Sequence, residues 1–203
     1  DGAVVYGDGN VTVDGSIFED NGATGNGGVV IGNNIILSNS EFTNNKATLG
    51  GAIYGISNLT VSNSNFAVNT ATNAGGAILW NNNANIIEST FINNIANYGG
   101  AIQGKNSPNS KGRVIKSTFT VNTATNAGGA INIENLVNLT VIDSIFNDNS
   151  APAGGAINGA TGTIVGVSNS TFNRNTATNK GGAINGENIV NIDNSNFVNN
   201  TKD

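Results

Sequence analysis

Residues 117–131 read STFTVNTATNAGGAI. This stretch joins two motifs, Ser-x-Phe-x-x-Asn and Gly-Gly-Ala-Ile, and the first of them occurs eight times in the 203-residue chain. Every phenylalanine of the chain occupies the third position of this motif, and successive copies are 24 to 28 residues apart. These residues are Phe18, Phe42, Phe66, Phe91, Phe119, Phe146, Phe172 and Phe197. Self-similarity at such a period predicts a solenoid whose units stack on one another.

Apolar residues precede each motif serine by three and five positions, as Val11 and Val13 do before Ser16, and this period of two predicts strands. Gly112 and Ala84 are the weakest positions of the pattern. Glycine doublets and asparagine-rich stretches between the strands predict tight corners with positive φ. We therefore expect an all-β fold, a single-stranded right-handed parallel β-helix (β-solenoid) of about eight coils of 24 to 28 residues.

One continuous solenoid over residues 1–203 is expected, because no linker interrupts the pattern. A single coil is too small to bury its own apolar side chains, so stacking at about 4.8 Å must supply the core. Since Asp1 already lies inside the pattern, we expect the chain to be a segment of a longer repeat protein.

Two inward columns follow from the motif, a phenylalanine stack and an asparagine ladder three residues further on. An inward amide can hydrogen-bond both to its copies and to the corner backbone. The ladder residues are Asn21, Asn45, Asn69, Asn94, Asn122, Asn149, Asn175 and Asn200. The motif serines suggest a parallel hydroxyl ladder. The isoleucine of Gly-Gly-Ala-Ile should also face inward, because the residue after it varies widely and is therefore expected on the surface.

The spacing from phenylalanine to the glycine doublet alternates between nine and eight residues along the chain. The sequence Asn-Thr-Ala-Thr-Asn recurs only after Phe66, Phe119 and Phe172. A two-coil working unit is therefore predicted.

Composition excludes several kinds of chemistry. The chain has no Cys, Met or His, so disulfides, thiolate or imidazole catalysis and the usual zinc sites are excluded. We expect no metal and no cofactor. A net charge of −5 argues against nucleic acid as a partner, and the lack of a long apolar run argues against membrane insertion by this segment.

The paired Gly-Gly-Ala-Ile and Phe-x-x-Asn motifs resemble the tandem repeat of the polymorphic outer-membrane proteins of chlamydiae and of related adhesin-like proteins. The resemblance covers nearly the whole chain. It implies an extracellular parallel β-helix, often an autotransporter passenger, that serves adhesion or display at the cell surface.

A basic corner is the main irregularity of the repeat. Half of the basic residues lie between Lys105 and Lys116, in the long corner 104–113 and just after it, and insertions in solenoids often carry binding. Lys105, Lys111, Arg113 and Lys116 are therefore candidates for contact with an anionic glycan or a protein receptor. The alternative is a solvated insertion without a ligand.

Aromatic and charged residues elsewhere supply further candidates. Tyr54 and Trp80 lie nearly in register in neighbouring coils and could stack on sugar rings, or could be ordinary surface packing or a contact between protomers. Glu88, Lys116 and Asp143 each precede a motif serine, which predicts a surface column of alternating charge. A polysaccharide lyase with Lys116 as its base is the less favoured interpretation of that column, and we expect no catalytic residues. Asp148 and Arg174 are expected to form an exposed pair.

Asparagine sequons provide candidate glycosylation sites in a suitable host. They begin at Asn10, Asn58, Asn138, Asn169 and Asn199. The Thr-Ala-Thr triplets raise an ice-binding alternative, which their occurrence in alternate coils disfavours.

The function predicted from the sequence is that of an extracellular or cell-surface adhesin or display stalk that binds a cell-surface glycan or protein receptor. The alternative is a filament subunit that associates end to end through uncapped coils. A glycan-cleaving enzyme is the least favoured hypothesis.

Overall fold

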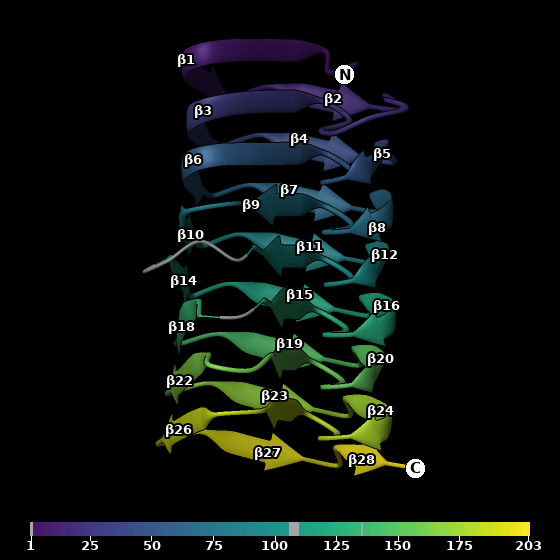
Figure 1. The fold of residues 1–203 in the computed structure, drawn as a ribbon, viewed down its shortest axis with the longest axis vertical. Coiled ribbons are helices and arrows are strands. Elements are labelled where there is room, and N and C mark those ends of the chain that lie inside the picture. The colour runs from purple at the N-terminus through teal and green to yellow at the C-terminus, as the bar shows by residue number, and fades with distance from the viewer. Residues whose placement is uncertain (1, 106–109, 135) are drawn as a thin grey trace.

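The chain forms one elongated stack of coils with the N- and C-terminal coils at opposite ends (Figure 1). The computed structural model describes residues 2–105, 110–134 and 136–203. These residues contain 28 strands. Within the same residues, no helix is long and apolar enough to cross a membrane. Paired strands are parallel, and each pair joins equivalent positions of successive coils. The all-β parallel solenoid of about eight coils predicted from the sequence is confirmed.

Three sheets run along the stack, and each coil after the first contributes strands to all of them. The first coil meets the 7-stranded sheet only through isolated bridges, Gly22 with Lys46 and Asn26 with Leu49. The 8-stranded sheet carries the phenylalanines and contains β2 (Ile17–Glu19), β4 (Glu41–Thr43), β7 (Asn65–Ala67), β11 (Thr90–Ile92), β15 (Thr118–Thr120), β19 (Ile145–Asn147), β23 (Thr171–Asn173) and β27 (Asn196–Val198). The 7-stranded sheet contains β5 (Lys46–Leu49), β8 (Thr70–Ala74), β12 (Ile95–Tyr98), β16 (Thr123–Ala127), β20 (Ser150–Ala153), β24 (Thr176–Lys180) and β28 (Thr201–Lys202).

The 13-stranded sheet combines two strand rows of the coil. Three long strands span both rows, β1 (Val5–Asp14), β3 (Val30–Ser38) and β6 (Ile53–Ser62). In later coils the first row contains β9 (Ile78–Trp80), β13 (Ile102–Gly104), β17 (Ile131–Ile133), β21 (Ile157–Gly159) and β25 (Ile184–Gly186). The second row contains β10 (Asn83–Ile87), β14 (Lys111–Ile115), β18 (Asn138–Ile142), β22 (Ile164–Ser168) and β26 (Ile189–Asp193).

Phenylalanine rings stack through the interior at the spacing of the strands. Neighbouring ring centroids lie 4.6 to 5.0 Å apart, and the rings are nearly parallel. The six rings from Phe42 to Phe172 are fully buried, whereas Phe197 in the last coil is 39% exposed. Each stacked pair adds about 0.5–1.5 kcal/mol beyond its buried area. Stacking coils therefore creates the core that a single coil lacks.

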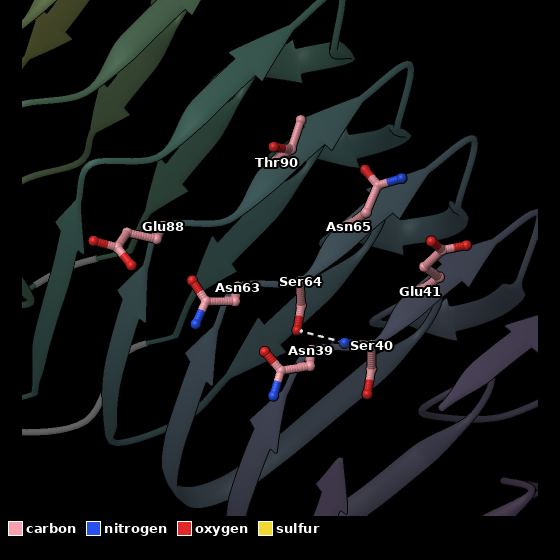
Figure 2. Close-up of a pocket in the computed structure, with 8 residues that line it drawn as sticks. All are labelled: Asn39, Ser40, Glu41, Asn63, Ser64, Asn65, Glu88 and Thr90. Atoms are coloured by element: carbon pink, nitrogen blue, oxygen red, sulfur yellow. Dashed lines mark hydrogen bonds between the residues drawn. The ribbon is translucent and has the colours of Figure 1, made fainter. Parts of the chain in front are cut away.

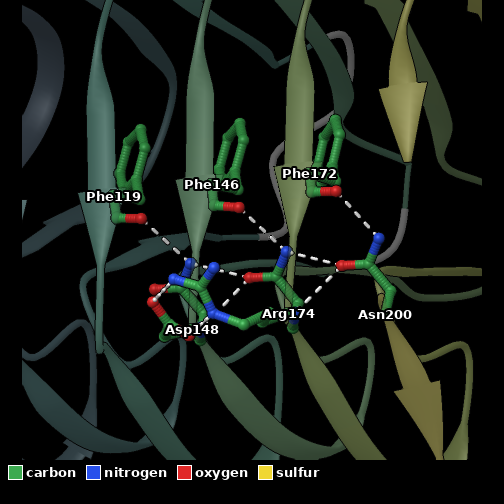
Figure 3. A network of polar contacts seen from close by, with 8 residues as sticks. Phe119, Phe146, Asp148, Phe172, Arg174 and Asn200 are labelled. Atoms are coloured by element: carbon green, nitrogen blue, oxygen red, sulfur yellow. Dashed lines mark hydrogen bonds and ion pairs between the residues drawn. The ribbon is translucent and has the colours of Figure 1, made fainter. Parts of the chain in front are cut away.

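An asparagine ladder ties each coil to the next (Figure 3). In the middle of the stack, the backbone N–H and the Nδ2 of Asn122 both donate to Asn149 Oδ1, each at 3.0 Å. Asn122 Nδ2 also donates to the carbonyl of Phe91 in the preceding coil, at 3.0 Å. The six ladder asparagines from Asn45 to Asn175 are completely buried. The ladder expected from the sequence is present, and its amides satisfy backbone groups at a corner that would otherwise be buried unpaired.

The motif serines form a related ladder that includes the backbone. The N–H of Ser117 donates to Ser144 Oγ at 3.1 Å, and the hydroxyl of Ser117 donates to the Ile115 carbonyl at 2.9 Å. The hydroxyls therefore do not bond to one another, as a simple hydroxyl ladder would require. Each serine instead pairs one backbone N–H and one carbonyl at its corner.

Each full coil turns at three positions where the backbone has positive φ: before the serine, before the ladder asparagine, and at the first glycine of the doublet. Gly75 has φ of 66°, and a Cβ on the following Gly76 would lie 1.9 Å from the Gly100 carbonyl oxygen, so only glycine fits there. Most coils place Asn or Asp before the ladder asparagine, as expected for left-handed φ. The exceptions are Val68, Val121 and Arg174 at φ of 60°, 56° and 52°, and all three are exposed.

The alternating spacing of the sequence becomes an alternating strand length. Strands β8, β16 and β24 have five residues, whereas β5, β12 and β20 have four. Because unequal strands pair in the 7-stranded sheet, their register shifts by a bulge, as between Ala47 and Leu49. The predicted two-coil unit thus corresponds to a bulge in every second coil.

A second amide ladder corrects the prediction about the residue that follows the Gly-Gly-Ala-Ile isoleucine. That residue was expected on the surface, yet Leu79 and Gln103 are fully buried. Asn132 Nδ2 donates to Gln103 Oε1 at 2.8 Å, and the same bond continues from Asn158 to Asn132 at 2.7 Å. The sequence carries a signal for this ladder, because the same repeat position is an amide residue in four successive coils: Gln103, Asn132, Asn158 and Asn185.

Replacing one ladder asparagine tests how strongly the coils are coupled. Asn122→Ala removes the acceptor of Asn94 and leaves the Phe91 carbonyl without its donor. We expect the free energy of unfolding to fall by about 3 kcal/mol or more, because several buried groups lose partners. The matched control is Asn126→Ala, an exposed asparagine of the same coil, with an expected change within about 0.5 kcal/mol. Urea unfolding measures both, and equal effects would contradict the ladder's role.

Candidate functional site

The basic corner divides into residues with different surroundings. Lys111 and Arg113 alternate along β14 with the buried Gly112, so both side chains point outward and are exposed. Neither side chain makes a hydrogen bond or ion pair with a described residue. Lys105 is half-buried, and its N–H donates to the Trp80 carbonyl at 2.9 Å. The remainder of the corner, residues 106–109, lies outside the described residues.

Lys116 belongs to a different surface, the predicted charge column. Its Nζ lies 3.7 Å from Glu88 Oε1, which confirms that these two residues face each other across neighbouring coils. Asp143 occupies the next coil at the same corner, since both Lys116 and Asp143 precede a ladder serine. Because both partners of the ion pair are largely exposed, it contributes little to stability. Lys116 therefore does not belong to the same surface as Lys111 and Arg113.

A shallow hollow of about 260 Å³ lies beside Lys111 and Arg113 on the outer face of the 13-stranded sheet. We call it the basic hollow. It is lined by three adjacent strands, β6, β10 and β14, through Asn58, Leu59, Thr60, Asn83, Ala84, Asn85, Lys111 and Arg113. Two cations, three amides and a hydroxyl thus converge on one small surface. Such a set can pair with an anion and with neutral hydroxyl groups at the same time.

Two lining amides are held in fixed orientations. Asn83 Nδ2 donates to Asn58 Oδ1 at 3.2 Å, and Asn58 Nδ2 donates to Asn34 Oδ1 at 2.9 Å. This outer ladder continues to Asn10 at 3.1 Å. Asn85 is not part of it, and its Oδ1 is buried without a hydrogen-bond partner among the described residues. The hollow therefore combines preorganised amides with one amide oxygen whose hydrogen bonding is incomplete.

Trp80 corrects the prediction of an exposed aromatic pair. Tyr54 is in register with Leu79, so Trp80 aligns with Gly55 and its ring is completely buried in the core. Because successive side chains of a strand alternate between faces, a shift of one residue turns Trp80 inward. Tyr54 is half-buried, and its phenol oxygen accepts a hydrogen bond from Asn81 Nδ2 at 3.0 Å. The two rings cannot form a joint sugar platform.

The buried indole also explains the two weak positions of the apolar pattern. A Cβ on Gly112 would lie 2.8 Å from the Trp80 ring, and one on Gly104 would lie 2.5 Å from it. Ala84 aligns with Gly112 in the neighbouring strand and is also small. These small residues leave interior space that the ring of Trp80 fills. The backbone of β14 between Lys111 and Arg113 therefore rests directly on a large, fixed side chain.

A double substitution tests this size compensation. Gly112→Val should lower the free energy of unfolding by about 1–3 kcal/mol, because its side chain collides with the Trp80 ring. With Trp80→Leu in the same chain, the combined loss should be at least about 1 kcal/mol smaller than the sum of the two single losses. Gly166→Val is the matched control, because only the Leu139 carbonyl lies within 4 Å of its added Cβ. Additive losses in urea unfolding would refute the compensation.

A second polar surface follows the serine corner (Figure 2). This surface contains a groove of about 500 Å³, and residues of the serine ladder form the bottom of the groove. There the Ser40 N–H donates to Ser64 Oγ at 3.2 Å. Its lining consists of Asn39, Ser40, Glu41, Asn63, Ser64, Asn65, Glu88 and Thr90. Glu88 already faces Lys116, which leaves Glu41 as the remaining carboxylate. This groove is therefore polar and acidic, unlike the basic hollow.

The predicted pair of Asp148 and Arg174 is present (Figure 3). Arg174 Nε and Nη2 donate to the two carboxylate oxygens of Asp148 at 2.7 and 2.8 Å. The hydrogen bonds from Arg174 hold the pKa of the Asp148 carboxyl below its usual value, and the guanidinium charge adds to this effect. Both side chains remain substantially exposed, so the pair organises the surface rather than the core.

All five sequon asparagines are exposed. Asn10, Asn58 and Asn138 lie in equivalent positions on the outer face of the 13-stranded sheet. Asn169 and Asn199 occupy corner positions with φ of 50° and 51°. Their glycosylation stays a prediction.

Coils that stack in register, with three parallel sheets around one continuous interior, define a parallel β-helix protein. The model of the right-handed β-helix region matches residues 1–166, and the chain belongs to this family. The match also agrees with the right hand expected for the coils.

The model of the Chlamydia polymorphic membrane protein repeat matches residues 169–187, which confirms the resemblance seen in the motifs. This similarity indicates a surface-exposed protein of the outer-membrane type. No curated protein matches the chain, and no solved structure does.

Proposed function

We propose that the chain is an adhesive rod displayed at the cell surface, and that the outer face of its 13-stranded sheet contacts an anionic partner on another cell. The observation that carries this proposal is the exposed pair of Lys111 and Arg113. Both cations lack a partner among the described residues of a chain whose net charge is −5. Cations left unneutralised on an acidic surface favour an external anion.

The rigidity of the rod supports this role. Strand β14 pairs with β10 on one side and with β18 on the other, so its backbone is fixed within the sheet. The buried Trp80 ring packs beneath it. The backbone of a contact surface built on such a strand loses little conformational entropy when a partner binds. The proposed role is binding rather than catalysis, and the proposed contact surface does not include Lys116, the candidate base of the lyase hypothesis, which faces Glu88.

Charge reversal tests the proposal. Lys111→Glu/Arg113→Glu should lower the amount of fluorescently labelled protein bound to cultured animal cells by about tenfold, because the partner's anionic groups would then be repelled. The control is Lys46→Glu/Lys180→Glu, which makes the same change of net charge at exposed positions of the 7-stranded sheet. Unfolding curves establish that each variant is folded. Equal binding by the two variants would refute the proposed contact surface.

End-to-end association remains a second prediction. In the last coil, Ile192 is 50% exposed and Phe197 is 39% exposed, although their counterparts in inner coils are buried. A further coil, from the same chain or from a second copy, would cover these side chains. Sedimentation velocity over a hundredfold range of concentration tests the second-copy case, since a sedimentation coefficient independent of concentration would contradict self-association.

A further inference from the structure

We propose that the basic hollow binds one acidic sugar residue of a glycan, a sugar that carries a carboxylate beside its ring hydroxyls. This inference rests on the proposed function and names the chemistry of the partner. The anion is recognised by Lys111 and Arg113, and the hydroxyls by Asn58, Asn83 and Asn85.

The two cations have the spacing of a carboxylate clamp. Residues two apart on a strand face the same side and lie about 7 Å apart, so one carboxylate can sit between both side chains. Arg113 offers a planar fork that binds a carboxylate through two hydrogen bonds, and Lys111 adds a mobile point charge. Because Gly112 between them packs on Trp80, this part of the strand cannot move inward.

The amides distinguish a sugar from a simple anion. A carboxylate or sulfate accepts hydrogen bonds only, whereas a sugar hydroxyl both donates and accepts. The hollow provides both functions, since each amide has an oxygen and a nitrogen and Thr60 adds a hydroxyl. The outer ladder holds Asn58 and Asn83 in place before any ligand arrives. A sugar can use the whole lining, whereas an inorganic anion uses only part of it.

Asn85 indicates where a sugar hydroxyl would donate. Its Oδ1 is buried and has no hydrogen-bond partner among the described residues, an unfavourable state for an amide oxygen. Asn85 is one of the residues that line the hollow, so a rotation of its side chain that exposes Oδ1 would let a ligand hydroxyl donate to it. A ligand that supplies a hydroxyl beside its carboxylate would therefore satisfy the acceptor and neutralise the cations together.

The size of the hollow limits the ligand. A volume of about 260 Å³ lies just below the usual range of drug-sized pockets, which begins at about 300 Å³. The hollow is open at the surface of the rod, so the rest of a glycan chain can extend away from it. We therefore assign one acidic residue to the hollow, with neighbouring sugars outside.

Calorimetric titration of the whole chain with an unbranched uronic acid trisaccharide tests the assignment. The acidic trisaccharide should bind at least about tenfold more tightly than its methyl-esterified, uncharged form, and more tightly than inorganic sulfate. Lys111→Gln/Arg113→Gln should abolish binding of the trisaccharide. Equal affinity for sulfate, or for an acidic peptide, would overturn the sugar assignment.

A single amide substitution separates sugar recognition from charge. Asn85→Ala should weaken binding of the trisaccharide by about tenfold and leave sulfate binding unchanged, because only a hydroxyl uses the amide. The matched control is Asn191→Ala, which removes an exposed asparagine from the same outer column in the last coil and should change neither affinity. An unaltered affinity of Asn85→Ala for the trisaccharide would contradict the proposal.

The two proposals fail separately. If charge reversal at Lys111 and Arg113 abolishes cell binding but no uronic acid trisaccharide binds, the sugar assignment is wrong and the adhesive face stands. If the trisaccharide binds in the hollow but charge reversal leaves cell binding unchanged, the hollow is a sugar site that does not carry the adhesion.

Discussion

Hydrogen bonds between ladder asparagines hold every coil to its neighbours. Each inner Asn joins its own backbone N–H and side chain to the Oδ1 of the following coil, and donates back to a phenylalanine carbonyl of the preceding coil. One residue type thus connects three coils at a corner, next to the backbone hydrogen bonds that Val121 and Thr123 make with neighbouring coils. The bonds hold neighbouring coils in register, and the phenylalanine stack in turn requires that register.

The amide ladders also differ in direction. In the phenylalanine-associated ladder, Nδ2 of Asn122 donates toward the later coil, to Asn149. In the ladder at Gln103 and in the outer ladder, the later coil donates to the earlier one, as Asn132 does to Gln103 and Asn34 to Asn10. The amide dipoles of the phenylalanine-associated ladder are therefore opposed by those of the other two ladders in the same rod. This opposition limits the build-up of a net dipole, an electrostatic benefit similar to that of alternating strand directions in a sheet.

Most of the fold was predictable from the sequence because a solenoid aligns each residue with its own copies. The spacing of phenylalanine and asparagine predicted the stack and the ladder, and the apolar residues before each motif serine together with the glycine doublets predicted the strands and corners of the coils. What the pattern could not supply was the orientation of residues at irregular places. Trp80 aligns with Gly55, the residue after Tyr54, and this shift of one residue turns the Trp80 side chain into the core. The second ladder was missed because Tyr54 and Leu79 occupy the same repeat position in earlier coils and hide the run of amides that begins at Gln103.

The candidate site was predictable in composition but not in geometry. Sequence alone grouped Lys105, Lys111, Arg113 and Lys116, whereas the fold pairs Lys116 with Glu88 and half-buries Lys105. The corners show why local preference is a poor guide, since Val68 and Val121 adopt a φ that β-branched residues rarely accept. In a solenoid, the neighbours above and below impose the backbone, so a residue's environment depends on the adjoining coils more than on its own sequence.

The irregular coil shows how such a rod can gain a binding surface without losing its register. Inside, Trp80 fills the space left by Gly104, Gly112 and the nearby Ala84. Outside, the same strand that carries Gly112 presents Lys111 and Arg113 beside the ladder amides of the neighbouring coils. Successive residues of a strand point to opposite faces. The small inward residue that makes room for Trp80 and the outward cations can therefore occupy one short segment without interfering. The repeat therefore supplies the rigidity, and one departure from the repeat supplies the exposed cations on which the proposed binding rests.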